Sequence, residues 1–438
     1  MSDMSKRFRP WTPEQNLLLP PSVQDWVEPE HLARFVLNLV MEQLDLKEIL
    51  KEYDQERGYP AFHPEMMVAL LLYSYSQRIY SSRRIAKACT ERIDFMVLTG
   101  QQKPDFRTIS MFRKRHLKKL RGLFGQVLQL CRKAGLAGLG HVALDGTRMQ
   151  ANASKEASIS YREMKKQEKQ LRADIDQWLG RSEQADREED RKYGKNRTGD
   201  ELPSWVTDKK KRLEKIQQAK AELEKEAKAK AEAEPEPAHT RHEAKPTGVP
   251  KAKDKRNLTD PESRMMKAKG GFVQGYNCQA AVDADHQIIV AQHVTQSGSD
   301  AHELKPLLKE IKQQMKRQAQ EISADAGYSS EHNLKELKRR HIQGYVANRW
   351  QKDSGQRESK LPAKMGRYAR QMWQRLRQGS YRSRYRLRKQ IVEPVFGQIK
   401  QGRGFRQFLL RGQQNVSGEW SLLCTVHNML KLAGASVQ

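Results

Sequence analysis

The chain has 438 residues and carries 81 Lys and Arg against 53 Asp and Glu, a formal net charge of +28. At about 150 residues per domain, this length predicts two or three domains with enough chain for a buried core. The basic excess argues against an ordinary small-metabolite enzyme and indicates a polyanionic partner, of which nucleic acid is the simplest. Only 37% of the residues are apolar, so part of the chain is expected to bury little.

The cysteines and the apolar runs restrict the setting of the protein. Four scattered cysteines form no CxxC pair, which favours a reduced environment such as the cytoplasm. The polar start MSDMSKRFRPWTPEQ contains no apolar signal-peptide core. The longest apolar run, near Met66–Tyr73, is far shorter than the roughly 18 residues of a membrane span. We therefore expect a soluble cytoplasmic protein without a membrane partner.

Residues 1–137 are predicted to form a helical N-terminal domain. Apolar residues recur at helical spacing over Pro29–Leu46 and His63–Ile79, and two segments with basic exposed faces follow, Ser81–Leu98 and Arg107–Leu136. Two short helices joined by a turn before a basic helix are typical of a helix-turn-helix unit, although a helical bundle with solvated charges gives the same pattern. A cluster of cations favours DNA contact, namely Arg113, Lys114, Arg115, Lys118, Lys119 and Arg121.

Residues 155–257 are predicted to be a charged insert that ends in a linker. Between residues 155 and 256 there are 27 Lys and Arg and 22 Asp and Glu, with opposite charges often four residues apart. This pattern predicts two long exposed helices, which a hairpin would join. The following EPEPAHTRHEAKPTGVPKAKDK is typical of a flexible linker, in which His239 and His242 have no partner ligands at zinc spacing. We interpret the insert as a solvated spacer.

Residues 138–154 and 258–438 are predicted to form one α/β domain that the insert interrupts. Strands are expected at His141–Met149, Tyr276–Val282 and Gln287–Thr295, and later at EISAD and IQGYVAN. Helices are expected between and after the later strands. This order is the one that an RNase H-like core requires, a mixed five-stranded sheet with helices on both faces.

The first helix after the strand pair carries a recognisable start signal. In SDAHELKPLLKEIKQQM, Asp300 and Glu303 have the spacing of a capping box, so we expect their side chains to cap this helix. The last 50 residues are expected to be helical, with one apolar face over Trp420–Leu432.

Three carboxylates fall where such a fold would bring them together. Asp145 interrupts an apolar strand, Asp325 ends a later strand and Glu393 lies in the final helical region. Each acid alone would be read as a cap or a surface charge, and their joint placement carries the interpretation. Carboxylates that converge at strand ends can hold two Mg²⁺ ions about 4 Å apart for in-line phosphoryl displacement. Asp283 and Asp285 are rivals for the second acid, but they lie in a hairpin turn that favours Asp for local hydrogen bonding.

Five ordered segments carry a resemblance to a known family. They are LDGTRMQANAS, NLTDPESRMMKAKGGFVQGYNCQAAVD, ISADAGYSS, VEPVFGQIK, and FLLRG followed by EWSLLCTVHNMLKL. With these segments the chain resembles bacterial insertion-sequence transposases of the DDE class, in the superfamily of the IS four and five families and most closely the IS eleven-eighty-two family. The likeness covers nearly the whole chain except the insert.

This resemblance implies a fold, an activity and partners. It implies an RNase H-like catalytic core with Asp145, Asp325 and Glu393 as its acidic, metal-binding triad. The metal would be Mg²⁺, for which Mn²⁺ can substitute. The substrates would be the double-stranded terminal inverted repeats of the element and a target DNA, which the enzyme would cleave and join as a homodimer on the bacterial nucleoid. The alternatives are a host-domesticated nuclease on the same core, and a non-catalytic DNA-binding protein; the presence of all three acids argues against the latter.

A basic C-terminal region surrounds the proposed third acid. Residues 331–412 hold 22 Lys and Arg against five acids, and aromatic residues are interleaved with them. Such a surface is typical of proteins that grip DNA through its phosphates and by stacking. The candidate DNA contacts are Tyr385, Arg386, Arg388, Lys389, Lys400 and Arg403, with Arg113, Lys114 and Arg115 in the N-terminal domain.

The register of these residues around Glu393 departs from the family pattern. Related transposases place Tyr seven residues before the Glu, Arg four before and Lys seven after, which is one helical face. Lys400 fits this pattern, but Arg386 and Lys389 occupy the two earlier positions. Tyr385 and Arg388 have the expected identities one position too early.

Pro394 offers a way to absorb that offset, because a helix that restarts there would bring Arg388 back to the site. We nevertheless expect the unshifted register, in which Lys389 and Lys400 flank Glu393.

Overall fold

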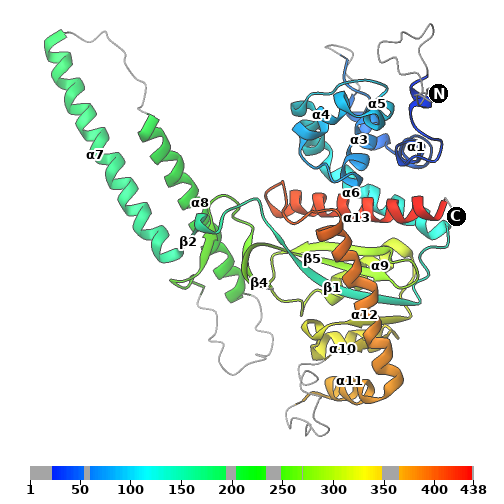
Figure 1. Cartoon of the computed structure of the whole chain (residues 1–438). Helices are drawn as coiled ribbons and strands as arrows, with labels where there is room; N and C mark the ends of the chain where they lie inside the picture. Colours follow the sequence, from blue (N-terminus) through cyan, green and yellow to red (C-terminus); the bar gives the residue numbers. More distant parts are fainter. Residues whose placement is uncertain are drawn as a thin grey trace, which may run out of the picture. The chain divides into compact units, whose positions relative to one another are not determined.

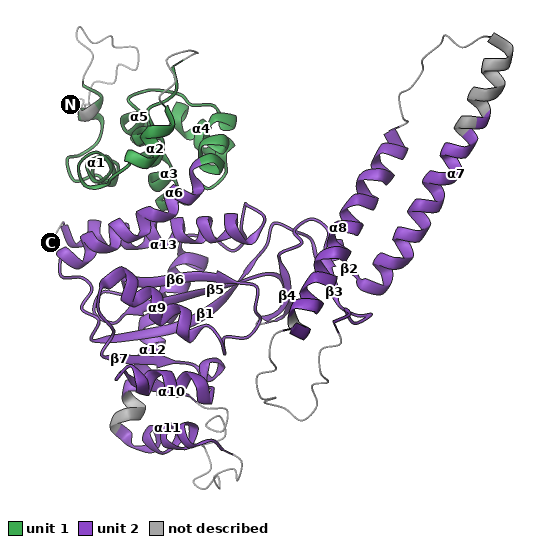
Figure 2. Cartoon of the chain, turned by 180° about the vertical axis from the view of Figure 1, so that it is seen from behind, with its two compact units in different colours: residues 1–115, 437 green, residues 116–436, 438 purple. Residues whose placement is uncertain are grey.

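The computed structural model describes residues 22–53, 60–193, 204–232, 248–268, 270–347 and 365–436. The chain divides into two compact units, residues 1–115 with 437, and residues 116–436 with 438 (Figure 2). The division falls inside the long helix α6 (Phe106–Lys133), whereas the sequence places a domain boundary at residue 137. The later half of α6 belongs to the second unit because it packs on α13 (Gln413–Ser436), where Ser421 Oγ donates to the carbonyl of Arg121.

Unit 1 is all helical in its described residues. Its helices are α1 (Leu32–Asn38), α2 (Lys47–Leu50), α3 (Pro64–Ser76), α4 (Ser82–Glu91), α5 (Ile93–Thr99) and the start of α6 (Figure 1). Helix α3 is the core helix, since almost all of its residues are buried. The single helix expected over Ser81–Leu98 is two helices, because the backbone is extended at Arg92. The Asp94 carboxylate at the start of α5 accepts bonds from the Arg92 guanidinium and from the Tyr73 hydroxyl of α3.

Unit 2 is built on a mixed six-stranded sheet. Strand β5 (Gly271–Asp283) pairs antiparallel with β1 (His141–Gln150) on one side, and on the other side with β4 (Arg264–Ala268) and β6 (Ile289–Thr295). Strands β7 (Glu321–Ala324) and β8 (Gln343–Val346) continue the sheet beyond β1 in parallel register. The five expected strands are present, and β4 is a sixth that the sequence does not predict. It pairs with residues 271–275 of β5, the part of that strand that extends beyond β6 along the same edge.

Helices lie on both faces of this sheet (Figure 1). Helices α9 (Leu304–Met315) and α10 (Glu331–Arg339) follow β6 and β7 in the chain and contact β6 and β8. Helices α11 (Arg367–Arg377), α12 (Gly379–Gly397) and α13 close the domain, and α12 contacts β1, β5, β7 and β8. Asn428 of α13 is buried and bonds both the amide and the carbonyl of Ile289, which fastens this helix to β6.

The insert contains the predicted helical hairpin. Helices α7 (Tyr161–Tyr193) and α8 (Ser204–Glu232) run antiparallel, and a short two-stranded sheet, β2 (Ser158–Ser160) with β3 (Lys255–Asn257), closes the base. The base is more than a solvated spacer. It buries a small apolar cluster of its own, and Glu226 of α8 pairs with the buried Arg256 and with Arg264 of β4. The histidines of the expected linker, His239 and His242, lie outside the described residues. No helix in the described part of the chain is both long and apolar enough to cross a membrane.

The two halves of the hairpin predict different responses to shortening. Lys209 Nζ lies 2.6 Å from Asp174 Oδ2, so a short Gly/Ser linker can join residues 174 and 209 without moving the base. We expect this chain to melt within a few degrees of wild type, because the deleted tip supports only itself. Replacing residues 164–234 by the same linker should lower the melting temperature clearly, because it leaves Arg256 buried without its carboxylate. Thermal unfolding followed by circular dichroism distinguishes the two deletions, and equal melting temperatures would contradict a structural role for the base.

Candidate active site

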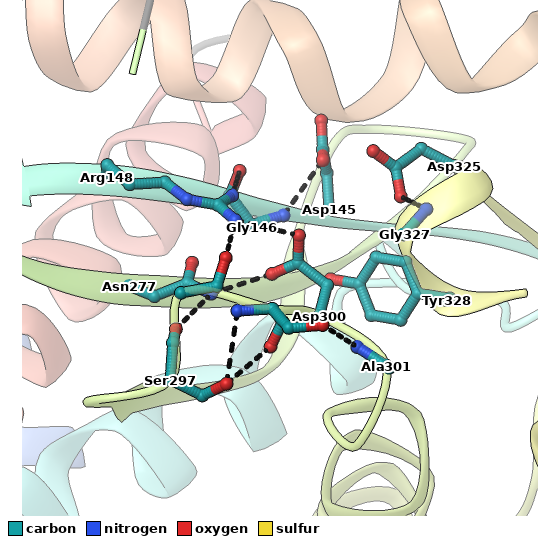
Figure 3. A network of polar contacts seen from close by, with 12 residues as sticks. Asp145, Gly146, Arg148, Asn277, Ser297, Asp300, Ala301, Asp325, Gly327 and Tyr328 are labelled. Carbon is teal, nitrogen blue, oxygen red and sulfur yellow. Dashed lines mark hydrogen bonds and ion pairs between the residues drawn. The ribbon is translucent and has the colours of Figure 1, made fainter. Parts of the chain in front are cut away.

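The parallel pairing of β1 with β7 brings two of the three predicted acids together. Leu144 pairs with Ala324 in this ladder, and Asp145 and Asp325 are the next residues on their strands. Neighbouring strands lie about 4.8 Å apart, so the two residues are adjacent across the sheet. Figure 3 shows both carboxylates on the same side of the ribbon, and their negative charges interact.

Asp145 is held in a defined orientation. Its Oδ1 accepts the Gly146 amide at 2.9 Å, and its Oδ2 lies 2.9 Å from Arg388 Nη1. Only 17% of the side chain is exposed, and burial raises its pKa to about 6 although the Arg388 charge acts to lower it. Asp325 ends β7 and caps the following turn, with its Oδ1 accepting the Gly327 amide at 2.8 Å.

Arg388 of α12 connects the third acid to this pair. Its Nη2 lies 3.3 Å from Oε1 of Glu393, whose side chain is 48% exposed at the rim of the site. Burial works against the charge of Arg388, but the charges of Asp145, Asp325 and Glu393 outweigh it and raise the pKa of the guanidinium. The charges of the three predicted acids therefore act on one largely buried cation.

The expectation that Lys389 flanks Glu393 in the site is not what the structure shows, since Arg388 reaches the acids and Lys389 is exposed. Helix α12 does not restart at Pro394. Pro394 has no backbone N–H to donate to the Gln390 carbonyl one turn earlier. This carbonyl accepts instead from Gln287 Nε2 at 3.0 Å. The apolar stripe that faces the sheet contains Val392, Val395 and Ile399, and its heptad spacing leads back to Arg388 and Tyr385. That stripe is the sequence signal that identifies Arg388.

The other predicted DNA contacts of the C-terminal region have different positions. Arg386 is exposed, and Tyr385 is partly buried against Arg388. Lys400 lies in a π-helical turn, Gln398–Gly402, and its Nζ donates to the Arg148 carbonyl of β1 at 2.8 Å. Burial lowers the pKa of Lys400.

Two predicted DNA contacts need correction because they are interior residues. Arg403 is 8% exposed and its Nη2 lies 3.2 Å from Nδ1 of the buried His427. Arg113 is 6% exposed and donates to the carbonyl of Tyr80, the Tyr75 hydroxyl and Ser82 Oγ, which holds α4 against α6. Counting cations along a helix could not separate these arginines from their exposed neighbours.

The neighbours of Arg113 remain at the surface. Lys114 is exposed, and Arg115 donates to the side chain and the carbonyl of Glu52 while its guanidinium lies over the Tyr53 ring.

Of the two rival acids, Asp283 is the last residue of β5 and Asp285 lies in the turn that follows. Asp283 is buried, and its oxygens accept the amides of Leu139 and Asp285 at 2.7 and 3.1 Å. These bonds close the β5–β6 turn and tie it to the start of β1, as the turn interpretation expects.

The donor set suits a hard divalent cation, since carboxylate oxygens are the ligands that Mg²⁺ and Mn²⁺ prefer. The site also accommodates positive charge, because the largely buried Arg388 guanidinium pairs with Asp145 and with Glu393. Within the described residues, no group of three or more Asp, Glu, His or Cys side chains stands ready to coordinate a metal. The acids are thus of the type that such cations prefer, and the Arg388 guanidinium lies between Asp145 and Glu393 in this structure.

Two family models match the chain. The first, described as Transposase domain (DUF772), matches residues 21–115, and the second, described as Transposase DDE domain, matches residues 238–429. Together they cover about two thirds of the sequence. No curated protein and no solved structure matches it.

The chain therefore belongs to the insertion-sequence transposases with a DDE domain, which are enzymes of DNA cleavage and transfer. This family acts on DNA and depends on divalent metal ions, and the mixed sheet preceded by a helical unit is consistent with an RNase H-like DDE core.

The position of Arg388 reverses the mutational order that the unshifted register implies. We expect Arg388→Ala to slow DNA cleavage more than Lys389→Ala does, because only Arg388 contacts Asp145 and Glu393. Single-turnover cleavage rates at saturating DNA compare the two variants. A larger defect for Lys389→Ala would restore the unshifted register.

The raised pKa of Asp145 predicts a pH-dependent cost to stability. Its folded-state pKa of about 6 lies above the unfolded value of about 3.9, so between these values the folded chain binds more protons. Protonated Asp145 therefore adds to the free energy of unfolding, relative to ionised Asp145. This stabilising contribution is fully present below about pH 4 and is lost as the pH rises through about 6. In EDTA we expect Asp145→Asn to raise the free energy of unfolding near pH 7.5 by at most about 3 kcal/mol, with little change near pH 4. Denaturant titrations at both pH values measure this, and an equal effect at both would contradict the raised pKa.

Proposed function

We propose that this transposase cleaves the ends of its own insertion sequence and joins them to a target DNA, with Asp145, Asp325 and Glu393 as its metal-binding triad. The observation that carries the proposal is the convergence of these acids on Arg388, at the point where β1, β7 and α12 meet. Bound there, Mg²⁺ or Mn²⁺ would activate the attacking oxygen and stabilise the leaving oxygen of a phosphodiester. Asp145 and Asp325 would share the metals, and Glu393 would complete one site.

The basic residues around the triad have separate tasks in this proposal. Arg388 neutralises Asp145 while the site is free of metal, and it can then turn to a DNA phosphate. Lys400, which lies against β1, supplies a further cation near the scissile strand. The exposed Arg386 and Lys389 are free to contact phosphates farther along the duplex. Synapsis of two element ends would require at least a homodimer, which would act on the nucleoid.

Recognition of the terminal repeats falls to unit 1 in this proposal. Helix α4 exposes Arg83, Arg84 and Lys87, and the guanidinium groups of Arg83 and Arg107 both lie over the exposed ring of Phe106. A basic helix beside a basic helix start is a surface that fits a DNA groove and its phosphates.

The triad makes a direct prediction for catalysis. Alanine at Asp145, Asp325 or Glu393 should abolish cleavage of DNA that carries the flanking element ends, with little loss of DNA binding, because the acids hold metal and the cations supply affinity. Gel-based cleavage and gel-shift assays measure the two properties. Asp285→Ala is the control. Asp285 is an exposed acid that was the alternative to Asp325, and the variant without it should cleave DNA at the wild-type rate. Full cleavage by any triad variant would remove that residue from the site.

The unit 1 surface makes a prediction for binding. We expect Arg84→Ala with Lys87→Ala to weaken binding to the terminal repeat and to reduce the slope of log K against log salt by about 2, one unit for each lost phosphate contact. The control replaces Lys211 and Lys225, two exposed lysines of α8, by Ala. An unchanged salt slope in the first variant would place recognition elsewhere, with the C-terminal basic region as the next candidate.

A further inference from the structure

A fourth carboxylate lies beneath the active site. Asp300, in the loop between β6 and α9, is only 6% exposed. Figure 3 shows it on the opposite side of β1 from the carboxylate of Asp145. The alternation of side chains along β1 explains this, because Asp145 faces α12 while the next residue, Gly146, faces Asp300.

The capping-box prediction is wrong, because Asp300 does not cap α9. Helix α9 begins only at Leu304, and its N-cap residue, Glu303, makes no side-chain cap and instead bonds His293. The Asp300 carboxylate points into the sheet. Its Oδ1 accepts from Asn277 Nδ2 and Gln279 Nε2 of β5, each at 2.7 Å, and its Oδ2 lies 3.1 Å from Arg148 Nη2 of β1.

This network touches both segments that carry the strand acids. A Cβ added at Gly146, the residue after Asp145, would lie 2.7 Å from Asp300 Oδ1. One added at Gly327, two residues after Asp325, would lie 3.2 Å from Asp300 Oδ2. The buried Tyr328 of the same turn donates its hydroxyl to Gln279 Oε1, and Gln279 in turn donates to Asp300. The backbone after each strand acid is therefore packed against one carboxylate.

Closing the loop does not by itself require a charge at this position. Asn277 Nδ2 also bonds the Ser297 carbonyl, Arg148 bonds the Gly298 carbonyl, and Ser297 Oγ bonds Ser299, so the loop has other anchors. Burying a carboxylate is costly even when it is paired. An amide at this position could accept from Asn277 and Gln279 through its one oxygen, but it could not also accept from Arg148. The charge is paired with Arg148, and it also acts on the neighbouring site, where it contributes to the raised pKa of Asp145.

We propose that Asp300 is a positioning residue for the metal site: it holds the segments after β1 and β7 at the separation that lets Asp145 and Asp325 coordinate the same divalent cations. This inference rests on the proposed function, because it takes these two acids as metal ligands. Residues that orient metal ligands without touching the metal typically change metal affinity by 10- to 100-fold when they are replaced. Asp300 has the contacts of such a residue, since it meets Arg148 and packs beside Gly146 and Gly327.

The test measures Mn²⁺ binding to the full chain by electron paramagnetic resonance, without DNA cleavage as the readout. Asp300→Asn keeps the shape of the side chain and removes its charge. The matched control is Asp260→Asn, because Asp260 is also buried and accepts from groups outside the acid site, the Tyr276 hydroxyl and the Gly412 amide. We expect Asp300→Asn to bind Mn²⁺ at least 10-fold more weakly than wild type, and Asp260→Asn to bind it as wild type does.

A purely structural role would lower the melting temperature of both variants and leave the Mn²⁺ affinity of the folded protein unchanged, which would overturn the inference. A wild-type chain that bound no Mn²⁺ would overturn the proposed function, and the inference with it. DNA binding should be the same in all three proteins, because no cation of the proposed DNA surface is altered.

Gly146→Ala keeps the proposal testable if Asp300→Asn does not fold. The added methyl would displace Asp300, whose Oδ1 lies 2.7 Å from the new Cβ, and also Gln279, yet it removes no polar group from the chain. We expect the same loss of Mn²⁺ affinity from this variant. Wild-type affinity in folded Gly146→Ala protein would overturn the inference.

Discussion

The constraint on which the catalytic unit depends is the placement of two like charges on neighbouring parallel strands. The β1–β7 register puts Asp145 beside Asp325, and at about 5 Å with an effective dielectric constant near 20 their repulsion is about 3 kcal/mol. Burial makes ionised Asp145 still less favourable and raises its pKa to about 6. A fold that keeps this pair must supply positive charge on the side where the carboxylates emerge. Arg388 supplies it from α12, and a bound metal would supply it during catalysis.

The geometry of α12 follows from that requirement. Arg388 must lie on the face of the helix that packs on the sheet, so it continues the apolar stripe of Val392 and Val395 rather than the exposed face of Lys389. The helix then has to continue past Pro394 to bring Lys400 back to β1. Gln287 makes this possible, because its side chain satisfies the Gln390 carbonyl that the proline leaves without a donor.

Much of this architecture could be predicted from the sequence, because periodicity and strand order are local signals. The order of strands and helices placed Asp145 and Asp325 on neighbouring elements, and the charge pairs at helical spacing predicted the hairpin of α7 and α8. Three features could not be predicted from the sequence because they depend on packing between distant segments. Strand β4 pairs with the part of β5 that extends beyond β6, Arg113 is buried by contacts with Tyr75 and Ser82, and Arg388 contacts an acceptor on β1.

Asp300 shows the same limit most clearly. Its spacing to Glu303 fits a capping box, but the helix starts later and the carboxylate pairs with residues of β1 and β5. The neighbouring Asp145–Gly146 pair lies within the strand expected at His141–Met149. Asp-Gly is usually a turn signal, yet here it lies in the middle of a strand. The strand needs an acid on one face for the active site and no side chain on the other, where Gln279 and Asp300 approach the backbone. The two adjacent residues therefore have complementary roles. Asp145 places a carboxylate on one face of the sheet, and Gly146 leaves room for the Asp300 carboxylate on the other.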